Sequence, residues 1–207
     1  KAYLDEAANS LISMISYARN AGLDPYKEYE GMIPVCDTQV KFAPIYRGYE
    51  NLKHSENKID FDDMLLQCLQ LFKEREWTLN KYKRHFKYIQ CDEYQDTNTA
   101  QFRLIHLLAS TKGDNGETLH NLCVVGDDDQ SIYKFRGANI KNILNFENSY
   151  PETEVIKLEE NYRSTQNILD AANAVIKNNQ VRKDKALWTQ HEKGDLIYLS
   201  QFDSDYD

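Results

Sequence analysis

Two short apolar runs, each followed closely by acidic residues, constrain the fold of this chain more than any other feature. Residues 88–91 lead directly to Asp92 and Glu93, and residues 122–125 lead to Asp127 after one glycine. A helical pattern separates the two runs. Strands that alternate with helices favour a parallel sheet covered by helices on both faces. Ligands of such sheets bind at the carboxyl ends of the strands, so we predict an α/β fold with a ligand site at these acids.

The rest of the chain continues the alternation. Apolar residues at three- and four-residue steps predict helices, and short apolar runs predict strands. We expect helices near residues 4–15, 60–72, 102–108, 140–146 and 168–176, and further strands at residues 154–158 and 196–199. Residues 26–57 are irregular, and we predict helices with mixed faces there.

Composition excludes several classes of protein. The 207 residues include 41% apolar and 28% charged side chains, with a net charge of −8, which is typical of a folded chain of one or two domains. We predict no membrane span, because no apolar run reaches about 18 residues. The four cysteines form no CxxC pair. We therefore predict no zinc site and no disulfides, but reduced thiols in a cytoplasmic protein, with Cys91 and Cys123 buried.

The pair Asp92–Glu93 has a specific chemical interpretation. An apolar strand that ends in Asp-Glu is the Walker B arrangement of nucleotide hydrolases, in which the Asp binds Mg²⁺ through water and the Glu activates the attacking water. Taken alone, two acids after a strand more often form a solvated loop. The decision therefore depends on the surrounding residues.

Three long motifs surround this pair. Residues 92–98 read DEYQDTN, residues 124–138 read VVGDDDQSIYKFRGA, and residues 158–165 read LEENYRST. In these motifs, and in residues 59–65 (IDFDDML), the chain closely resembles the UvrD/Rep family of superfamily 1 DNA helicases, including its PcrA-like members. The resemblance extends from about Leu11 to about Thr189. It implies a RecA-like sheet of the P-loop NTPase type together with a helical insertion subdomain.

The resemblance also implies roles in ATP hydrolysis. Asp92 would bind Mg²⁺ through water and Glu93 would be the general base. Gln130, expected at the end of a strand, would sense the γ-phosphate, since an amide can hydrogen-bond both phosphate and water. Arg163 would act as an arginine finger, and Tyr162 would stack on adenine. ATP and Mg²⁺ are therefore the expected cofactors.

A second set of residues would contact DNA. Tyr133, Phe135 and Arg136 resemble the single-strand contacts of the family, because aromatic faces stack on any base. Phe135 departs from the tryptophan frequent at this position, and an ordinary core role stays open for it. The basic and aromatic run of residues 81–88 has the texture of a nucleic-acid patch, but its place before a strand favours a solvated segment. Expected partners are single-stranded DNA and its junctions with duplex.

One element of the family is missing from these residues. None of the eight glycines is followed by Lys, so the GxxxxGK[ST] loop that holds the phosphates is absent. We therefore expect an internal fragment of a helicase that moves 3′ to 5′ in repair or replication, with little ATPase activity of its own. The expected division is residues 1–58 for the remainder of the insertion subdomain, 59–150 for the later part of the first motor domain and 151–207 for the start of the second.

Two other functions stay open. One is a metal-dependent nuclease that uses Asp92, Glu93 and Asp127 as a two-metal cluster. The aspartates 127–129 invite the same interpretation, although Gln130 and the aromatics after them favour the helicase motif. The other is a non-catalytic module that binds DNA or protein.

Overall fold

The computed structural model describes residues 2–113, 115–134, 137–179 and 182–201. Phe135 and Arg136, both predicted DNA contacts, lie outside these residues. The chain divides into two units, Lys1–Tyr150 and Pro151–Asp207, and each is described by itself. The expected division into three parts stays a prediction.

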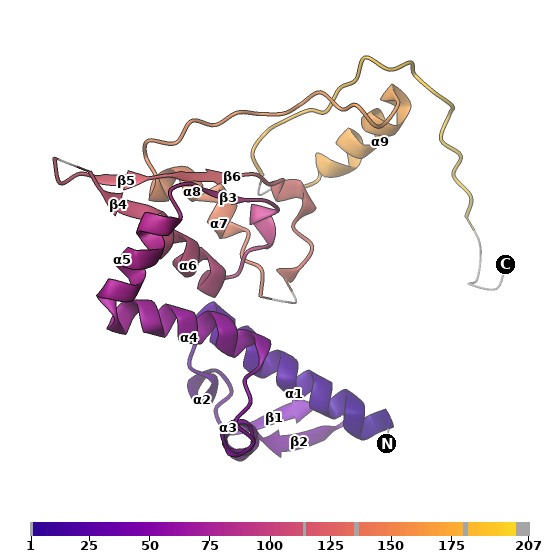
Figure 1. Cartoon of the computed structure of the whole chain (residues 1–207). Coiled ribbons are helices and arrows are strands. Elements are labelled where there is room, and N and C mark those ends of the chain that lie inside the picture. Colours follow the sequence, from indigo (N-terminus) through magenta and orange to yellow (C-terminus); the bar gives the residue numbers. More distant parts are fainter. Residues whose placement is uncertain (1, 114, 135–136, 180–181, 202–207) are drawn as a thin grey trace. The chain divides into compact units, whose positions relative to one another are not determined.

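The first unit begins with helices around a hairpin (Figure 1). The elements are α1 (Ala2–Ala21), α2 (Pro25–Glu28), β1 (Met32–Val35), β2 (Thr38–Lys41) and α3 (Phe42–Ser55). Ile33 and Val35 alternate inward and pack with Ile15 and Phe42. Helices predicted for residues 26–57 are present as α2 and α3, but a two-residue turn pairs β1 with β2 between them, and this hairpin was not predicted.

Three further helices pack against one another. They are α4 (Phe61–Glu74), α5 (Glu76–His85) and α6 (Thr99–Ala109). The first turn of α4 is closed by a reciprocal capping box between Asp60 and Asp63, and that of α6 by one between Asn98 and Gln101. Each box satisfies backbone N–H groups that a helix leaves without partners. This local chemistry fixes where both helices begin, and α6 therefore starts directly after the DEYQDTN motif.

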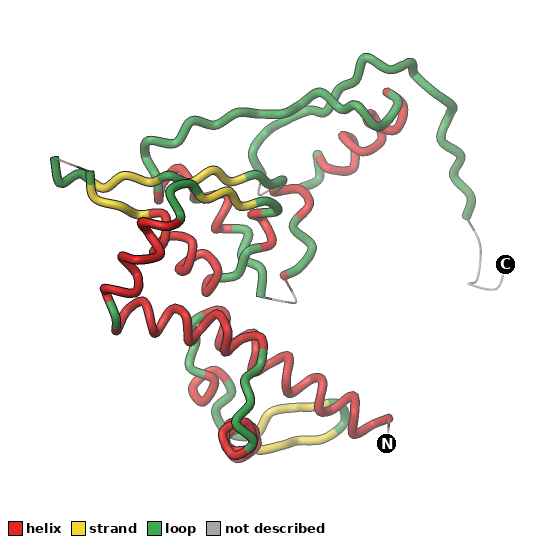
Figure 2. The backbone as a smooth tube through the Cα atoms, in the orientation of Figure 1, coloured by secondary structure: helices red, strands yellow, loops and turns green. Residues whose placement is uncertain are grey.

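The predicted parallel sheet is present as a pair of strands. Strand β3 (Ile89–Cys91) pairs in parallel with β6 (Leu122–Val124), while β4 (Ser110–Lys112) and β5 (Thr118–His120) form an antiparallel hairpin. Helices α7 (Lys141–Leu144) and α8 (Phe146–Ser149) complete the unit. The α/β class is thus confirmed, as Figure 2 shows by the mixture of strands and helices.

The core of this region lies on one face of the strand pair. Tyr94, Phe146 and Tyr150 are buried there against Leu122 and Val124, together with apolar residues of α6 and α7. Side chains alternate along a strand, and Cys123 therefore points to the other face, where it is exposed. The prediction that Cys123 is buried is wrong for this reason, and Cys91 is half-buried.

The second unit contains helix α9 (Gln166–Ile176). Its other described residues are loop (Figure 2), apart from a parallel bridge between Glu160 and Trp188. The strands predicted at residues 154–158 and 196–199 are not formed in the described part of this unit. Both runs are largely exposed, because no neighbouring strand pairs with them. Nowhere in the described chain is a helix both long and apolar enough to cross a bilayer.

Candidate active site

The site lies where β3 and β6 end together. Cys91 is in register with Val124, and the ladder continues as the Val125 amide donates to the Cys91 carbonyl over 2.8 Å. The Tyr94 amide then donates to the Val125 carbonyl over 2.9 Å. The DEYQDTN motif and the loop after β6 therefore begin at the same edge of the strand pair, as the sequence predicted.

Asp92 and Glu93 form an exposed, tightly folded corner at this edge. The Glu93 backbone N–H donates to Asp92 Oδ1 over 2.8 Å. The Asp92 side chain is exposed, and its other oxygen, Oδ2, does not take part in this hydrogen bond. Glu93 has φ of 50° and ψ of 41°, the left-handed region. This conformation costs a residue with a Cβ roughly 1–3 kcal/mol, and such residues cluster at functional sites. The backbone is thus bent at the residue predicted to be the base.

A pocket of about 310 Å³ opens beside this corner, lined by Asp92, Glu93, Asp96 and Thr97 among others. The Asp96 Oδ1 atom is buried and has no hydrogen-bond partner among the described residues. Burial, followed by the charge of Glu93, raises the pKa of Asp96 above its ordinary value. The pocket is therefore lined by three carboxylates, whose oxygens can bind a cation.

This donor set fits Mg²⁺, which prefers carboxylate oxygens and keeps several waters. The orphaned oxygen of Asp96 is an acceptor that a hydrated cation can satisfy. Sequence reasoning missed Asp96, although its signal was visible as a third acid within the same short motif. The side chain of Asp92, the predicted Mg²⁺ ligand, is exposed at this corner.

Gln130 lies in a 3₁₀ helix, Asp128–Gln130, that follows β6 after a short loop. Its Nε2 atom donates to Asp127 Oδ2 over 2.8 Å, and Asp127 Oδ1 accepts from the Asp129 backbone N–H over 3.0 Å. Asp127 thereby caps the turn that presents Gln130. Gln130 itself is exposed, and is not at the strand end as predicted.

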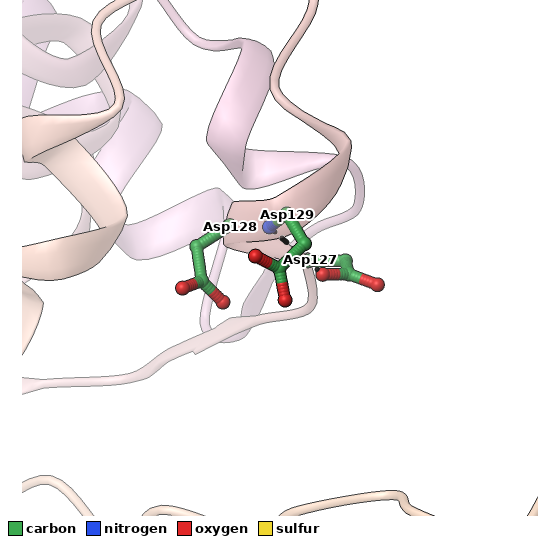
Figure 3. Close-up of side chains that lie close together, drawn as sticks. All are labelled: Asp127, Asp128 and Asp129. Atoms are coloured by element: carbon green, nitrogen blue, oxygen red, sulfur yellow. Dashed lines mark hydrogen bonds between the residues drawn. The ribbon is translucent and has the colours of Figure 1, made fainter. Parts of the chain in front are cut away.

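The three aspartates of this loop lie close together. One carboxylate oxygen from each of Asp127, Asp128 and Asp129 falls within 4.8 Å of the others. Figure 3 shows that Asp127 turns toward the Asp129 backbone, and the hydrogen bond drawn there is the turn's own cap. Both carboxylate oxygens of Asp127 accept hydrogen bonds from the loop. These hydrogen bonds give Asp127 a structural role as the cap of this turn.

Gln95 connects the two parts of the site. Its buried side chain donates to Glu93 Oε2 over 2.7 Å and accepts from the Asp127 backbone N–H over 3.0 Å. The structure thus brings Glu93 and the loop of Gln130 into one hydrogen-bonded unit. Sequence reasoning missed Gln95, because no periodicity distinguishes a buried amide from the exposed acids beside it.

The predicted DNA-contact segment follows the same loop. The Ser131 hydroxyl donates to the Gln95 carbonyl over 3.3 Å, and the Asn139 amide donates to the Thr97 carbonyl over 3.0 Å. Tyr133 lies between these anchors and is 38% exposed. The segment is therefore attached at both ends to the DEYQDTN motif.

Tyr162 and Arg163 lie side by side in the second unit. Asn161 Oδ1 accepts from the backbone N–H of Arg163 over 2.9 Å and from that of Ser164 over 2.7 Å. This turn leaves the Tyr162 and Arg163 side chains exposed. The Tyr162 hydroxyl donates to Glu160 Oε2 over 2.8 Å, and this hydrogen bond raises the pKa of Tyr162.

Comparison with known proteins identifies the family of this chain. Residues 2–151 match the UvrD/REP helicase N-terminal domain, and residues 156–207 match the UvrD-like helicase C-terminal domain. The chain is 45% identical over 201 residues to ATP-dependent DNA helicase PcrA of Leuconostoc citreum, covering 96% of this chain and 25% of that protein.

Two staphylococcal relatives give a similar result. The protein of the same name from Staphylococcus epidermidis is 52% identical over 155 residues, and that from Staphylococcus aureus is 51% identical over 156 residues. Each alignment covers 75% of this chain and 20% of the relative. The chain thus spans a quarter or less of the length of these relatives. From the two matched domains and the identity to these relatives, we conclude that this chain belongs to the UvrD/REP helicase family.

Proposed function

We propose that this chain works in an ATP-dependent DNA helicase, where it supplies the base and the phosphate sensor for ATP hydrolysis and a surface for single-stranded DNA. The observation that carries the proposal is the shared edge of β3 and β6. There the exposed Asp92–Glu93 corner and the Gln130 turn are joined through Gln95. The names of the relatives, ATP-dependent DNA helicase PcrA, support the same activity.

In this proposal each side chain has one task. The Glu93 carboxylate takes a proton from the attacking water, and Gln130 orients that water against the γ-phosphate. Asp92 holds Mg²⁺ through water, and the ion, when bound, neutralises charge on the phosphates. Arg163 stabilises the charge that develops on the γ-phosphate, while Tyr162 stacks on the adenine ring.

The DNA surface is assigned to the loop after Gln130. Tyr133 and Phe135 would stack on bases and Arg136 would pair with the phosphate backbone. Single-stranded DNA and its junctions with duplex are the proposed partners. Four free cysteines support a reducing, cytoplasmic location.

A chimera tests the catalytic part of this proposal. This chain replaces the segment that it matches in the Leuconostoc citreum relative, and ATP hydrolysis is measured with and without single-stranded DNA. We expect DNA-stimulated hydrolysis. Glu93→Gln should keep ATP binding and lower turnover by roughly 10²–10⁴-fold, because the amide cannot accept the proton. Glu6→Gln, which changes an exposed carboxylate of α1, is the control.

Two results would contradict the proposal. If the Glu93→Gln chimera hydrolyses ATP at the unsubstituted rate, Glu93 is not the base. If the 207-residue chain cleaves DNA with Mg²⁺ or Mn²⁺ in the absence of ATP, the two-metal nuclease is the better assignment.

A further inference from the structure

Gln95 is a buried amide at the centre of the candidate site. It is 1% exposed and belongs to the largest fully buried side chains of the described residues. A buried primary amide is stable when its oxygen and its NH₂ group both have partners. Gln95 meets this requirement with partners from two different segments, Glu93 before it and Asp127 from the loop after β6.

The orientation of this amide follows from the chemistry of its partners. The Asp127 backbone N–H can only donate a hydrogen bond, so the atom of Gln95 that faces it must be the carbonyl oxygen. The NH₂ group therefore faces the Glu93 carboxylate at 2.7 Å, with Asp96 Oδ2 at 3.5 Å on its margin. Reversal of the amide would set its oxygen against the carboxylate and its NH₂ against an N–H.

Gly126 makes this close approach possible. A Cβ atom at Gly126 would lie 2.6 Å from Gln95 Oε1 and 3.1 Å from the Tyr94 amide nitrogen. The first distance is shorter than any ordinary Cβ contact, and the second is tighter than most. A larger residue at position 126 would therefore require the loop or the Gln95 side chain to move. The absence of a side chain at Gly126 therefore lets the loop after β6 rest directly on Gln95.

The loop continues from this contact to Gln130. Asp127, whose backbone N–H is held by Gln95, accepts from Gln130 Nε2 through its own carboxylate. The backbone carbonyl of Gln95 also accepts from the hydroxyl of Ser131, the residue after Gln130. The turn that presents Gln130 is therefore fixed to the Gln95 side chain before it and to the Gln95 backbone after it.

We propose that Gln95 is a positioning residue that orients the Glu93 carboxylate and sets its spacing to Gln130. This inference rests on the proposed function. One N–H of Gln95 occupies Oε2 of Glu93, and Oε1, which accepts no hydrogen bond from the described residues, can accept the proton of the attacking water. An amide suits this task because it donates a hydrogen bond without carrying a transferable proton.

The bridge is tested first without catalysis, by nuclear magnetic resonance of the 207-residue chain. Glu93→Ala removes the acceptor of the Gln95 NH₂ group. We expect it to shift the Gln95 side-chain amide signals and, through Gln95, the backbone amide signal of Asp127. In the Gln95→Leu background the same substitution should leave Asp127 unmoved. An equal shift of Asp127 in both backgrounds would overturn the bridge.

A second variant separates the two contacts. When its carboxylate is ionised, Gln95→Glu keeps an oxygen for the Asp127 N–H but loses the donor to Glu93. Hydrogen exchange of the Asp127 amide should therefore remain slow in Gln95→Glu and become faster in Gln95→Leu. Fast exchange in both variants, in a chain whose other amides keep their protection, would show that the Gln95 oxygen does not hold the loop.

Steady-state kinetics of the chimera test positioning. Gln95→Leu and Gln95→Glu should each lower kcat by roughly 10–100-fold, as is typical when the partner that orients a functional group is lost, and leave KM for ATP within about twofold. Gln70→Leu is the matched control, because Gln70 donates an equivalent 2.7 Å hydrogen bond to exposed Glu74 in α4. An unchanged kcat in Gln95→Glu would overturn the proposal.

The two proposals fail in different ways. An unsubstituted chimera that binds DNA but does not hydrolyse ATP counts against the proposed function, while the resonance experiment still decides whether Gln95 bridges Glu93 and Asp127. A chimera that hydrolyses ATP and loses turnover with Glu93→Gln, but not with either Gln95 variant, supports the proposed function and overturns the role of Gln95.

Discussion

Asn98 Nδ2 donates a hydrogen bond to Asn20 Oδ1 over 3.2 Å, and thereby joins two buried amides that are 78 positions apart. Asn20 Nδ2 in turn donates to the Ser16 carbonyl and to Asp62 Oδ1. Asn98 is the N-cap of α6. This pair therefore connects α1 and α4 to the end of the DEYQDTN motif.

Asn20→Leu should lower the free energy of unfolding by about 2 kcal/mol, because it leaves the buried Asn98 NH₂ group without this acceptor. Urea denaturation followed by circular dichroism measures the change. Ser13→Ala is the control, since Ser13 makes an exposed hydrogen bond on the same helix and should change stability by less than about 0.5 kcal/mol. Equal effects of the two substitutions would show that the Asn20–Asn98 contact adds nothing.

Two glycines offer a matched pair of substitutions. Gly126→Ala places a Cβ against Gln95, Ile143 and the Tyr94 backbone, so it should destabilise the first unit by roughly 1–3 kcal/mol through overpacking. Gly48→Ala, within α3, meets nothing within 4 Å and should stabilise by about 0.5–1 kcal/mol, because alanine favours helix. Thermal unfolding of both variants gives the comparison. A neutral Gly126→Ala would show that the loop moves aside without cost.

Local patterns predicted the helices well. The apolar periodicity of residues 4–15 and 60–72 is a feature of a few helical turns, and α1 and α4 formed over these residues. The edge shared by β3 and β6 was also predictable, because parallel strands must end on the same side. These are consequences of short-range periodicity and of one topological rule.

Contacts between distant segments were not predictable in this way. The runs at residues 154–158 and 196–199 have strand-like composition, but a strand also requires a partner at hydrogen-bonding distance. The roles of Gln95 and Asn20 depend on what lies beside them in space, at Asp127 and Asn98. Composition and spacing carry no signal for such a pairing within a single sequence.

A charged network joins α1, α3 and α4. Lys53 Nζ lies 3.0 Å from Glu50, 2.9 Å from Asp60 and 2.7 Å from Asp63, while Arg19 pairs with the same two aspartates. Burial by itself raises the pKa of Asp60, but the Lys53 hydrogen bond, the Asp63 backbone N–H and the Tyr49 hydroxyl outweigh it and hold that pKa well below 3.8.

Stability should therefore fall in acid. The folded state binds a proton at Asp60 less readily than the unfolded state, so the contribution is present in full above the ordinary aspartate pKa and is lost as the pH falls below it. The chain with Asp60→Asn should therefore lose roughly 2 kcal/mol less unfolding free energy between about pH 5 and pH 2 than the unsubstituted chain. Urea denaturation across this range, with exposed Asp5→Asn as control, gives the slopes; equal slopes would contradict the prediction.

Breaking the same network at neutral pH is a separate prediction. Lys53→Met should cost about 3 kcal/mol, because it removes one cation that three carboxylates share and leaves them with Arg19. The Lys53 side chain is 11% exposed, whereas Lys58 in its pair with Glu56 is 71% exposed. Lys58→Met is therefore the control, and its expected change is below about 1 kcal/mol. A similar cost for both lysines would show that burial does not strengthen the network.

The assignment of DNA contact to the loop after Gln130 is tested on the 207-residue chain. Phe135→Ala should weaken binding of a labelled single strand by about 1–3 kcal/mol, the stacking contribution of one base, and by the same amount for dT and dA oligonucleotides. Gln130→Ala should leave this affinity unchanged, because Gln130 is assigned to phosphate. Trp77→Ala, at a side chain of α5 that is 68% exposed, is the aromatic control. Fluorescence anisotropy gives the affinities and thermal unfolding gives the stability of each variant. If Phe135→Ala binds DNA normally and unfolds at a markedly lower temperature, Phe135 is a core residue, and the DNA contact must be assigned elsewhere.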